Sequence, residues 1–235
     1  MQITLLIFII VAAIVSRLPI VGKYFSIINT LIHEIGHALM AIITGGKVDK
    51  IQLFANTEGT AWTSNRFWLG RVLTSAAGYV FSSFIAFAFL YSISIERFEY
   101  CIPIEKLGYC ISIERYELIL YTLVVFLVIG LLFWIRNLYG FFWMISFTAG
   151  FAYLIWKGND VVTEYVLLFI TATILVQSIY SAWEILYLSF KSPSDAGDAT
   201  NLAKSTFIIP AQVWGIFFFL QSLYFGWLGL SLFLR

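Results

Sequence analysis

Long apolar segments separated by short polar ones make up most of the chain. Seven of these segments approach the roughly 20 residues that a helix needs to cross the hydrocarbon core of a bilayer. They cover residues 3–21, 25–44, 67–92, 118–135, 138–157, 161–190 and 208–233. The pattern predicts an all-α integral membrane protein with about seven transmembrane helices, the first of which we interpret as a retained anchor rather than a cleaved signal peptide.

One polar segment has a different periodicity. Residues 47–65, between the second and third predicted spans, alternate loosely between apolar and polar side chains around the turn Asn56-Thr57-Glu58-Gly59. Such alternation around a turn predicts a short β-hairpin, with an ordinary polar loop as the alternative. The hairpin would directly follow the helix that ends near Thr44-Gly45-Gly46.

A second polar segment contains a short duplication. The sequence Ile-Ser-Ile-Glu-Arg-Phe-Glu at residues 93–99 recurs as Ile-Ser-Ile-Glu-Arg-Tyr-Glu at residues 111–117. Two copies are too few for a solenoid, so we interpret residues 93–117 as a duplicated extramembrane loop. It contains both cysteines, Cys101 and Cys110, which could form a disulfide in an oxidising compartment or remain free thiols in a reducing one.

Composition supports the membrane class and excludes one class of partner. Hydrophobic residues make up 61% of the chain and charged residues 11%, with a mean hydropathy of +0.91. The net charge of +1 and the lack of basic runs exclude nucleic acid as a partner. We expect a single membrane-embedded domain over residues 1–235, with the lipid bilayer as its surroundings.

Basic residues balance between the two sides of the predicted spans, so they do not fix the orientation. A cluster of them follows the second span, however: Lys47, Lys50, Arg66 and Arg71. This cluster favours the cytoplasm for that face. With seven spans, the N-terminus would then be cytoplasmic too, and the cysteine loop would lie outside.

The candidate chemistry lies in the second apolar segment. The chain has two histidines, His33 and His37, and Glu34 follows the first, which gives the pattern His-Glu-Ile-Gly-His. Four residues advance a helix by a little more than one turn, so both imidazoles project from one face and can bind one Zn²⁺. Glu34 is positioned to act as general base on the hydrolytic water. The structural alternative is a histidine pair that packs helices, but ionisable groups at membrane depth are costly and usually mark function.

A catalytic zinc site needs a third protein ligand. Without a third histidine or a suitable cysteine, a carboxylate is expected, and the segment before the last span supplies Asp195 and Asp198. With seven spans this segment lies on the same side as the C-terminal end of the histidine helix. Glu164 and Glu184 in the sixth span are the alternatives.

Three stretches in this order resemble the site-2 protease family of membrane zinc metallopeptidases, in its B-like bacterial branch (metallopeptidase family M50). They are His33-Glu34-Ile35-Gly36-His37-Ala38-Leu39 through Val48, Ser75-Ala76-Ala77-Gly78-Tyr79, and the late pattern of Asp-Ala, Leu-Ala, Thr, Pro and Trp. The resemblance covers nearly the whole chain apart from the duplicated loop. From the sequence alone we interpret the small residues of the second stretch as a helix-packing signal.

The resemblance implies a role for each residue. His33 and His37 would bind zinc, Glu34 would be the catalytic base, and an aspartate near the last span would complete the metal shell. Asp198 keeps the branch's spacing to Leu202, Ala203 and Thr206, whereas Asp195 keeps the Ser-Asp-Ala triplet and is the alternative ligand. The hairpin would receive an extended substrate by strand addition.

The better-known members of that family carry an Asn-Pro pair and a Leu-Asp-Gly triplet that do not occur in this chain. The oxyanion-stabilising residue is therefore unassigned, with Gln212, Asn201 and Thr206 as candidates.

The sequence therefore predicts a multi-pass intramembrane zinc endopeptidase that cleaves transmembrane or juxtamembrane segments of membrane proteins. We expect it in a bacterial cytoplasmic membrane with the active site toward the cytoplasm. Two alternatives stay open. One is a membrane zinc protease with Glu164 or Glu184 as third ligand, and the other is a membrane binding or regulatory protein with a vestigial zinc site.

Overall fold

Six long apolar helices dominate the structure, a computed structural model that describes residues 2–95, 97–102 and 109–234. Each is long and apolar enough to cross a membrane. They are α2 (Val21–Ile43), α3 (Trp68–Ser94), α4 (Arg115–Ile129) with its π-helical continuation (Gly130–Trp134), α5 (Leu138–Lys157), α6 (Asp160–Lys191) and α8 (Ala211–Ser231). The predicted fold class, an all-α multi-pass membrane protein with a short β-hairpin, is confirmed.

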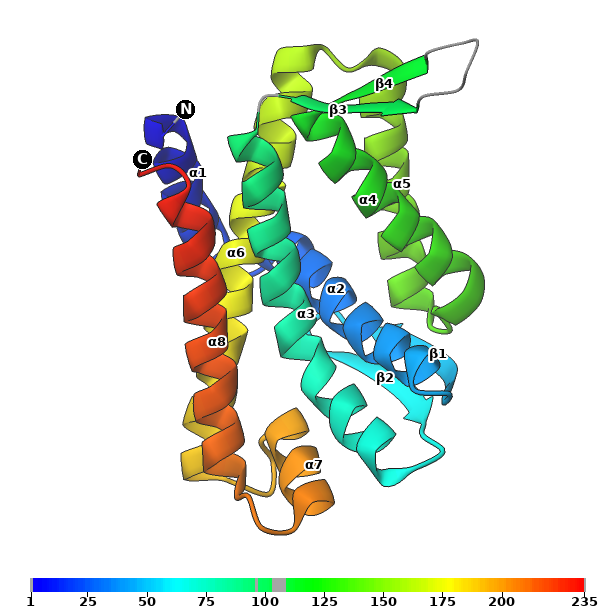
Figure 1. Ribbon diagram of the computed structural model, residues 1–235, viewed down its shortest axis with the longest axis vertical. Helices are drawn as coiled ribbons and strands as arrows, with labels where there is room; N and C mark the ends of the chain where they lie inside the picture. Colours follow the sequence, from blue (N-terminus) through cyan, green and yellow to red (C-terminus); the bar gives the residue numbers. More distant parts are fainter. Residues whose placement is uncertain (1, 96, 103–108, 235) are drawn as a thin grey trace.

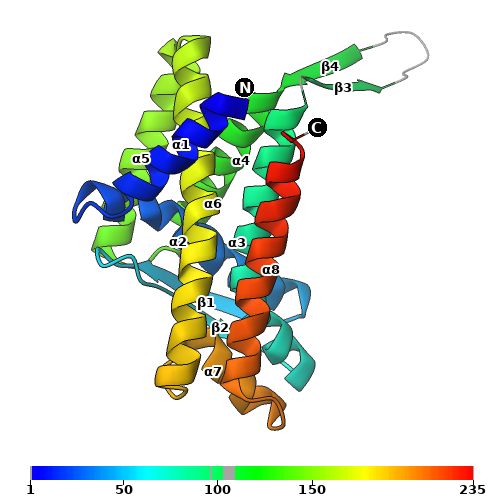
Figure 2. The same cartoon turned by 90° about the vertical axis from the view of Figure 1, so that its left-hand side faces the viewer.

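The first predicted span is shorter in the structure than in the sequence analysis. Helix α1 covers Gln2–Val15, which is 14 residues and about 21 Å at 1.5 Å per residue, less than the roughly 30 Å of a hydrocarbon core. Pro19 explains its early end, because proline lacks an N–H and disfavours helical backbone at the residue before it. Figure 2 shows α1 running obliquely to about mid-height, where α2 begins.

Both termini lie at one end of the molecule. Gln2 and Ile3 line a small pocket together with Ser94 at the end of α3 and with Leu232 and Phe233 after α8. The hairpin lies at the opposite end, where α3 begins (Figure 1). The structure therefore differs from the expectation that the N-terminus and the hairpin share one side, because α1 does not make a full crossing separate from that of α2.

The predicted hairpin follows α2 as β1 (Lys47–Leu53) and β2 (Gly59–Ser64). The outer edge of β1 is covered by the segment between α4 and α5. Ile51 pairs with Ile135 in a parallel bridge, and the side-chain amide of Asn137 both accepts from Leu53 N and donates to Leu53 O. The other edge of the sheet, that of β2, faces α2 and the candidate site.

The duplicated segment forms a second hairpin at the end of the molecule that carries the termini (Figure 1). Strand β3 (Arg97–Ile102) pairs antiparallel with β4 (Tyr109–Glu114), so each copy of the repeat contributes to one strand. In this register Cys101 lies opposite Cys110. The side chains of residues 96–115 lie outside the described part of the chain, and so does the predicted choice between a disulfide and free thiols.

The segment before the last span, for which the sequence pattern predicts no helix, forms the separate helix α7 (Gly197–Thr206). Its apolar side packs into a cluster with residues of α3, α6 and α8: Tyr79, Ala182, Ala196, Ala199, Leu202, Ala211 and Phe218. The indole N–H of Trp68, at the start of α3, donates to the Ser205 carbonyl at 2.5 Å. This packing holds α7 at the same end of the molecule as the hairpin (Figure 1).

Candidate metal centre

The histidine motif occupies the buried middle of α2. His33, Glu34 and His37 lie in consecutive turns of this helix, and Glu34 and His37 are 5% and 7% exposed. Before the motif the helix buries isoleucines and leucines, after it the helix buries Ala38 and Ala41, and it ends at Ile43, shortly before Gly45 with its positive φ of 74°. The local sequence thus builds a regular helix that presents both imidazoles on one face, as the four-residue spacing predicts.

Asp198 comes to this face from the first turn of α7. Its Oδ2 lies 3.2 Å from His33 Nε2 and 3.1 Å from His37 Nε2, and the two Nε2 atoms are 3.0 Å apart. Four-coordinate zinc with ligand bonds of about 2.0–2.1 Å places neighbouring ligand atoms about 3.3 Å apart. The three atoms therefore already form one triangular face of a tetrahedron of nearly this size.

Helix α3 orients the second histidine. His37 Nδ1 lies 2.6 Å from the carbonyl oxygen of Thr74. Because a carbonyl can only accept, Nδ1 carries a proton in this bond, so Nε2 is the nitrogen that can give up its proton and bind a metal through its lone pair. Metal-ligating histidines are commonly fixed by such a bond from the other ring nitrogen.

Gly78 gives the imidazoles the space they occupy. A Cβ at this position would lie 2.5 Å from His33 Cε1, His33 Nε2 and His37 Nε2. The next residue, Tyr79, packs edge-on against the His33 ring with centroids 4.5 Å apart. The Ser75–Tyr79 stretch, interpreted from the sequence as a packing signal, thus also forms one wall of the histidine site.

Strand β2 forms the wall opposite Glu34. The backbone of Ala61 lies beside the Glu34 carboxylate, and a Cβ at Gly59 would lie 2.6 Å from Glu34 Oε1. Thr30, one turn before Glu34, donates from its hydroxyl to the Thr57 carbonyl at 2.8 Å. These contacts hold the free edge of the hairpin directly over the glutamate.

The histidines determine the protonation of Asp198. Burial by itself would raise the pKa of this carboxyl, but the charge of His37 and the hydrogen bonds from both imidazoles outweigh it and hold the pKa below its usual range. Asp198 is therefore an ionised acceptor at neutral pH, which is the state that a metal ligand requires.

The other predicted ligands lie elsewhere. Asp195 is exposed in the turn between α6 and α7, where its Oδ2 accepts from the Ser192 hydroxyl at 2.5 Å. Glu164 accepts from the Tyr116 hydroxyl at 2.8 Å, near the far end of α6. Glu184 lines the same cavity as the motif. The residues whose potential ligand atoms all lie within 4.8 Å of one another are His33, His37 and Asp198, and Glu184 does not belong to this group.

A cavity of about 900 Å³ opens onto the three candidate ligands. It is bounded by α2, the free edge of β2, the start of α3, the end of α6 and the start of α7. Asn201, one of the three candidate oxyanion residues, lines it. Thr206 instead donates to Leu202 O and accepts from the Trp214 indole, and neither Thr206 nor Gln212 is among the lining residues.

In the comparisons with known proteins, a family model described as Peptidase M50B-like matches residues 6–229 of the chain. Neither the curated proteins nor the solved structures give a match.

Proposed function

The chain belongs to the M50B-like peptidases, the B-like branch of the site-2 protease family, and from this membership we propose that it is an intramembrane zinc endopeptidase. One observation carries the proposal: three potential ligand atoms, from helices far apart in the sequence, lie within 3.2 Å of one another beside a buried glutamate. Family membership supports a membrane metalloprotease in general, and this geometry supports the specific site.

The donor set suits zinc. Two imidazole nitrogens and one carboxylate oxygen are ligands that Zn²⁺ takes readily, and three protein ligands leave the fourth position of a tetrahedron for substrate or water. His33, His37 and Asp198 would hold the ion. When bound, zinc supplies a Lewis acid that polarises the scissile carbonyl and lowers the pKa of water.

Glu34 has the position of a general base. It follows His33 by one residue, so its carboxylate lies beside the ligand cluster without being one of its members. In the proposed reaction Glu34 takes a proton from the attacking water and delivers it to the leaving amine. The carboxylate lies against the cavity wall formed by β2, where a Cβ at Gly59 would be 2.6 Å from Glu34 Oε1.

The free edge of β2 is the proposed docking strand for the substrate. Ile51 and Leu53 of β1 direct backbone groups toward residues 136 and 137, so their partners across the hairpin, Ala61 and Gly59, direct theirs toward the cavity. An unwound substrate segment could add to this edge as a further strand, which would extend its peptide bonds past Glu34.

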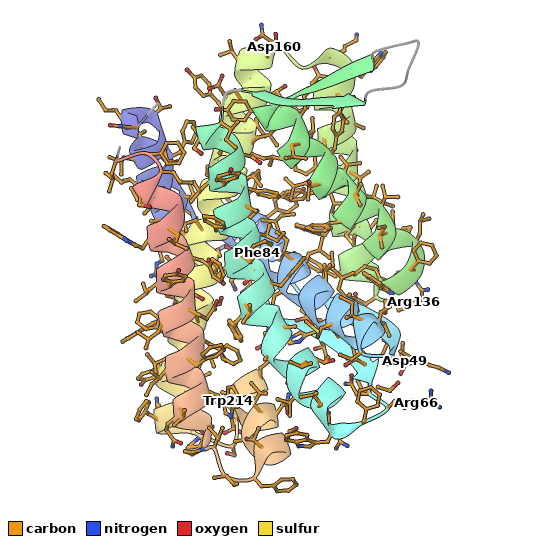
Figure 3. All side chains as sticks on the ribbon, in the orientation of Figure 1. Asp49, Arg66, Phe84, Arg136, Asp160 and Trp214 are labelled. Atoms are coloured by element: carbon orange, nitrogen blue, oxygen red, sulfur yellow. The ribbon has the colours of Figure 1, made fainter. Side chains whose placement is uncertain are left out.

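The substrate would be a transmembrane or juxtamembrane segment of another membrane protein. The candidate site lies toward the hairpin end of the molecule, and Arg66, Asp49 and Arg136 mark that end in Figure 3, far from Asp160. Basic residues near this end favour a cytoplasmic active site in a bacterial inner membrane.

Cleavage of a single-span model substrate by purified protein tests this function. Glu34→Gln removes the base but keeps the size of the side chain, so we expect unchanged zinc content and a rate lower by about 10²–10⁴-fold, the usual contribution of a general base. The paired control is Glu164→Gln, a carboxylate on the distant part of α6, which should cleave at the wild-type rate.

Cleavage by Glu34→Gln at the wild-type rate would contradict the mechanism. A wild-type protein that holds zinc yet cleaves none of a panel of single-span substrates would favour the alternative of a binding or regulatory protein.

A further inference from the structure

Acidic residues gather around the candidate active-site cavity, although the chain as a whole is nearly neutral. Its sequence has 13 Asp and Glu against 14 Lys and Arg. Five of the carboxylates line the cavity, whereas no Lys or Arg of the described residues does. The acidic lining residues are Glu34, Glu58, Glu184, Asp195 and Asp198.

Zinc would balance only two of these charges. Zn²⁺ with Asp198, Glu34 and two neutral histidines sums to zero, which leaves the three negative charges of Glu58, Glu184 and Asp195. They belong to the hairpin turn, to α6 and to the turn before α7, so they approach the cavity from different sides. Within the described part of the chain, none of the three forms an ion pair with a Lys or Arg.

A buried amide on α2, in the lining of the same cavity, points independently to a peptide ligand. Asn29 lies four residues before His33, hence on the same face of α2, and it lines the cavity while only 5% exposed. Its Oδ1 is buried and has no hydrogen-bond partner. A buried acceptor without a partner is costly, and rotation of the side-chain amide toward the cavity would let the backbone N–H of an extended substrate satisfy it.

We propose that this cavity selects substrate segments that carry Lys or Arg beside the cleaved bond, with the basic side chain held between Glu58 and Glu184. The inference rests on the proposed function and names its substrate class: membrane proteins with a basic juxtamembrane flank. Such flanks are common on the cytoplasmic side of membrane proteins, which is the side proposed for this site.

Asn29 and the two glutamates would divide the recognition. The amide accepts from the backbone of the segment, whatever its sequence. The glutamates would form ion pairs with one basic side chain. Because both glutamates are exposed, their contribution to substrate binding should weaken as salt is added. Lys and Arg should both serve, since an exposed carboxylate imposes little geometric demand.

Three single-span model substrates that differ only in their juxtamembrane flank (four Lys, four Ser or four Glu) test the proposal. Binding to zinc-loaded Glu34→Gln protein in detergent is measured first, because it needs no turnover, and cleavage by the wild type second. Two exposed ion pairs predict that the Lys flank binds about tenfold more tightly than the Glu flank at low salt. The double variant Glu58→Gln/Glu184→Gln should lose this preference.

Asp49→Asn is the matched control, because Asp49 lies on the same hairpin but outside the cavity lining. It should keep the full preference. Equal binding of the three flanks, or a preference that survives the double variant, would overturn the inference.

The two proposals fail separately. Cleavage of all three substrates at one rate would refute the basic selectivity and leave the endopeptidase standing. A Lys preference in binding that depends on Glu58 and Glu184, without cleavage of any flank by the wild type, would support the recognition site and contradict the proposed protease function.

Discussion

At the scale of single residues, the space beside the two imidazoles depends on Gly78. Even a methyl group there would lie 2.5 Å from ring atoms of both histidines, so Gly78→Ala must displace the rings from the position in which they face Asp198. We expect zinc affinity to fall by about 10- to 100-fold, the range typical of changes around metal ligands. A competition titration against a chromogenic chelator measures this.

Gly150→Ala provides the control for that substitution. Gly150 lies within α5, and a Cβ at this position would meet no atom within 4 Å. This variant should bind zinc as the wild type does. If Gly78→Ala did the same, the arrangement of α3 against the histidines would not constrain the site.

The sequence predicts some of these residues and misses others for a physical reason. His33, Glu34 and His37 belong to one helix, so helical periodicity alone defines their common face. Asp195 and Asp198 are three residues apart in a polar stretch. Asp198 faces the histidines and Asp195 does not, because Ala196, Ala199 and Leu202 are buried against other helices, and the local sequence does not determine this packing. Gly78 leaves room for rings on a helix some 40 positions earlier in the chain, so the small residues of its stretch predict close helix packing but not the contact with the imidazoles.

At the scale of elements, the hairpin beside the candidate site depends on a contact from outside it. Asn137 closes the outer edge of β1 with two hydrogen bonds, of 3.2 and 2.6 Å, to the backbone of Leu53. Asn137→Ala should lower the free energy of local opening of β1 by about 1–3 kcal/mol, the cost of leaving such backbone groups without partners. Hydrogen exchange should then accelerate at Leu53, and substrate cleavage should slow while zinc content stays unchanged.

Asn159→Ala is a fitting comparison, because it also removes an asparagine hydrogen bond, the 2.9 Å cap on Val161 N of α6. It should leave exchange in β1 unaltered. Equal exchange at Leu53 in wild type and Asn137→Ala would show that the hairpin does not need this clamp.

Among the elements, length and hydropathy predict the six long helices, and alternation around a turn predicts the hairpin. Two features escape prediction. The segment at residues 135–137 joins β1 although its own sequence has no strand pattern, since a single bridge and one amide side chain make the connection. Helix α7 is short and polar, and its helical state depends on packing against α3, α6 and α8.

At the scale of the whole molecule, the break between α1 and α2 changes the expected topology. The structure groups Gln2 with the ends of α3 and α8, so the N-terminus should face the opposite side of the membrane from the hairpin and α7. In a background with Cys101→Ser and Cys110→Ser, the single variants Gln2→Cys, Asp49→Cys and Ser194→Cys allow labelling by a membrane-impermeant maleimide. Asp49→Cys and Ser194→Cys should react from one side, and Gln2→Cys from the other.

Labelling of all three positions from one side would support seven complete crossings instead. The relation between the histidine helix and α7 holds under either count, because the four helices α3 to α6 separate them in both. The sequence therefore predicts correctly that Asp198 lies on the same side as the histidines, even though the predicted first span is longer than α1.

The central claim is that His33, His37 and Asp198 form one zinc site. Zinc per chain, measured in purified detergent-solubilised protein for the wild type, Asp198→Ala and Asp195→Ala, tests it most directly. The account predicts about one zinc in the wild type and in Asp195→Ala, because a single tetrahedral site has three protein ligands, and almost none in Asp198→Ala. A wild type without zinc under non-chelating conditions, or an Asp198→Ala protein with a full complement, would contradict the account.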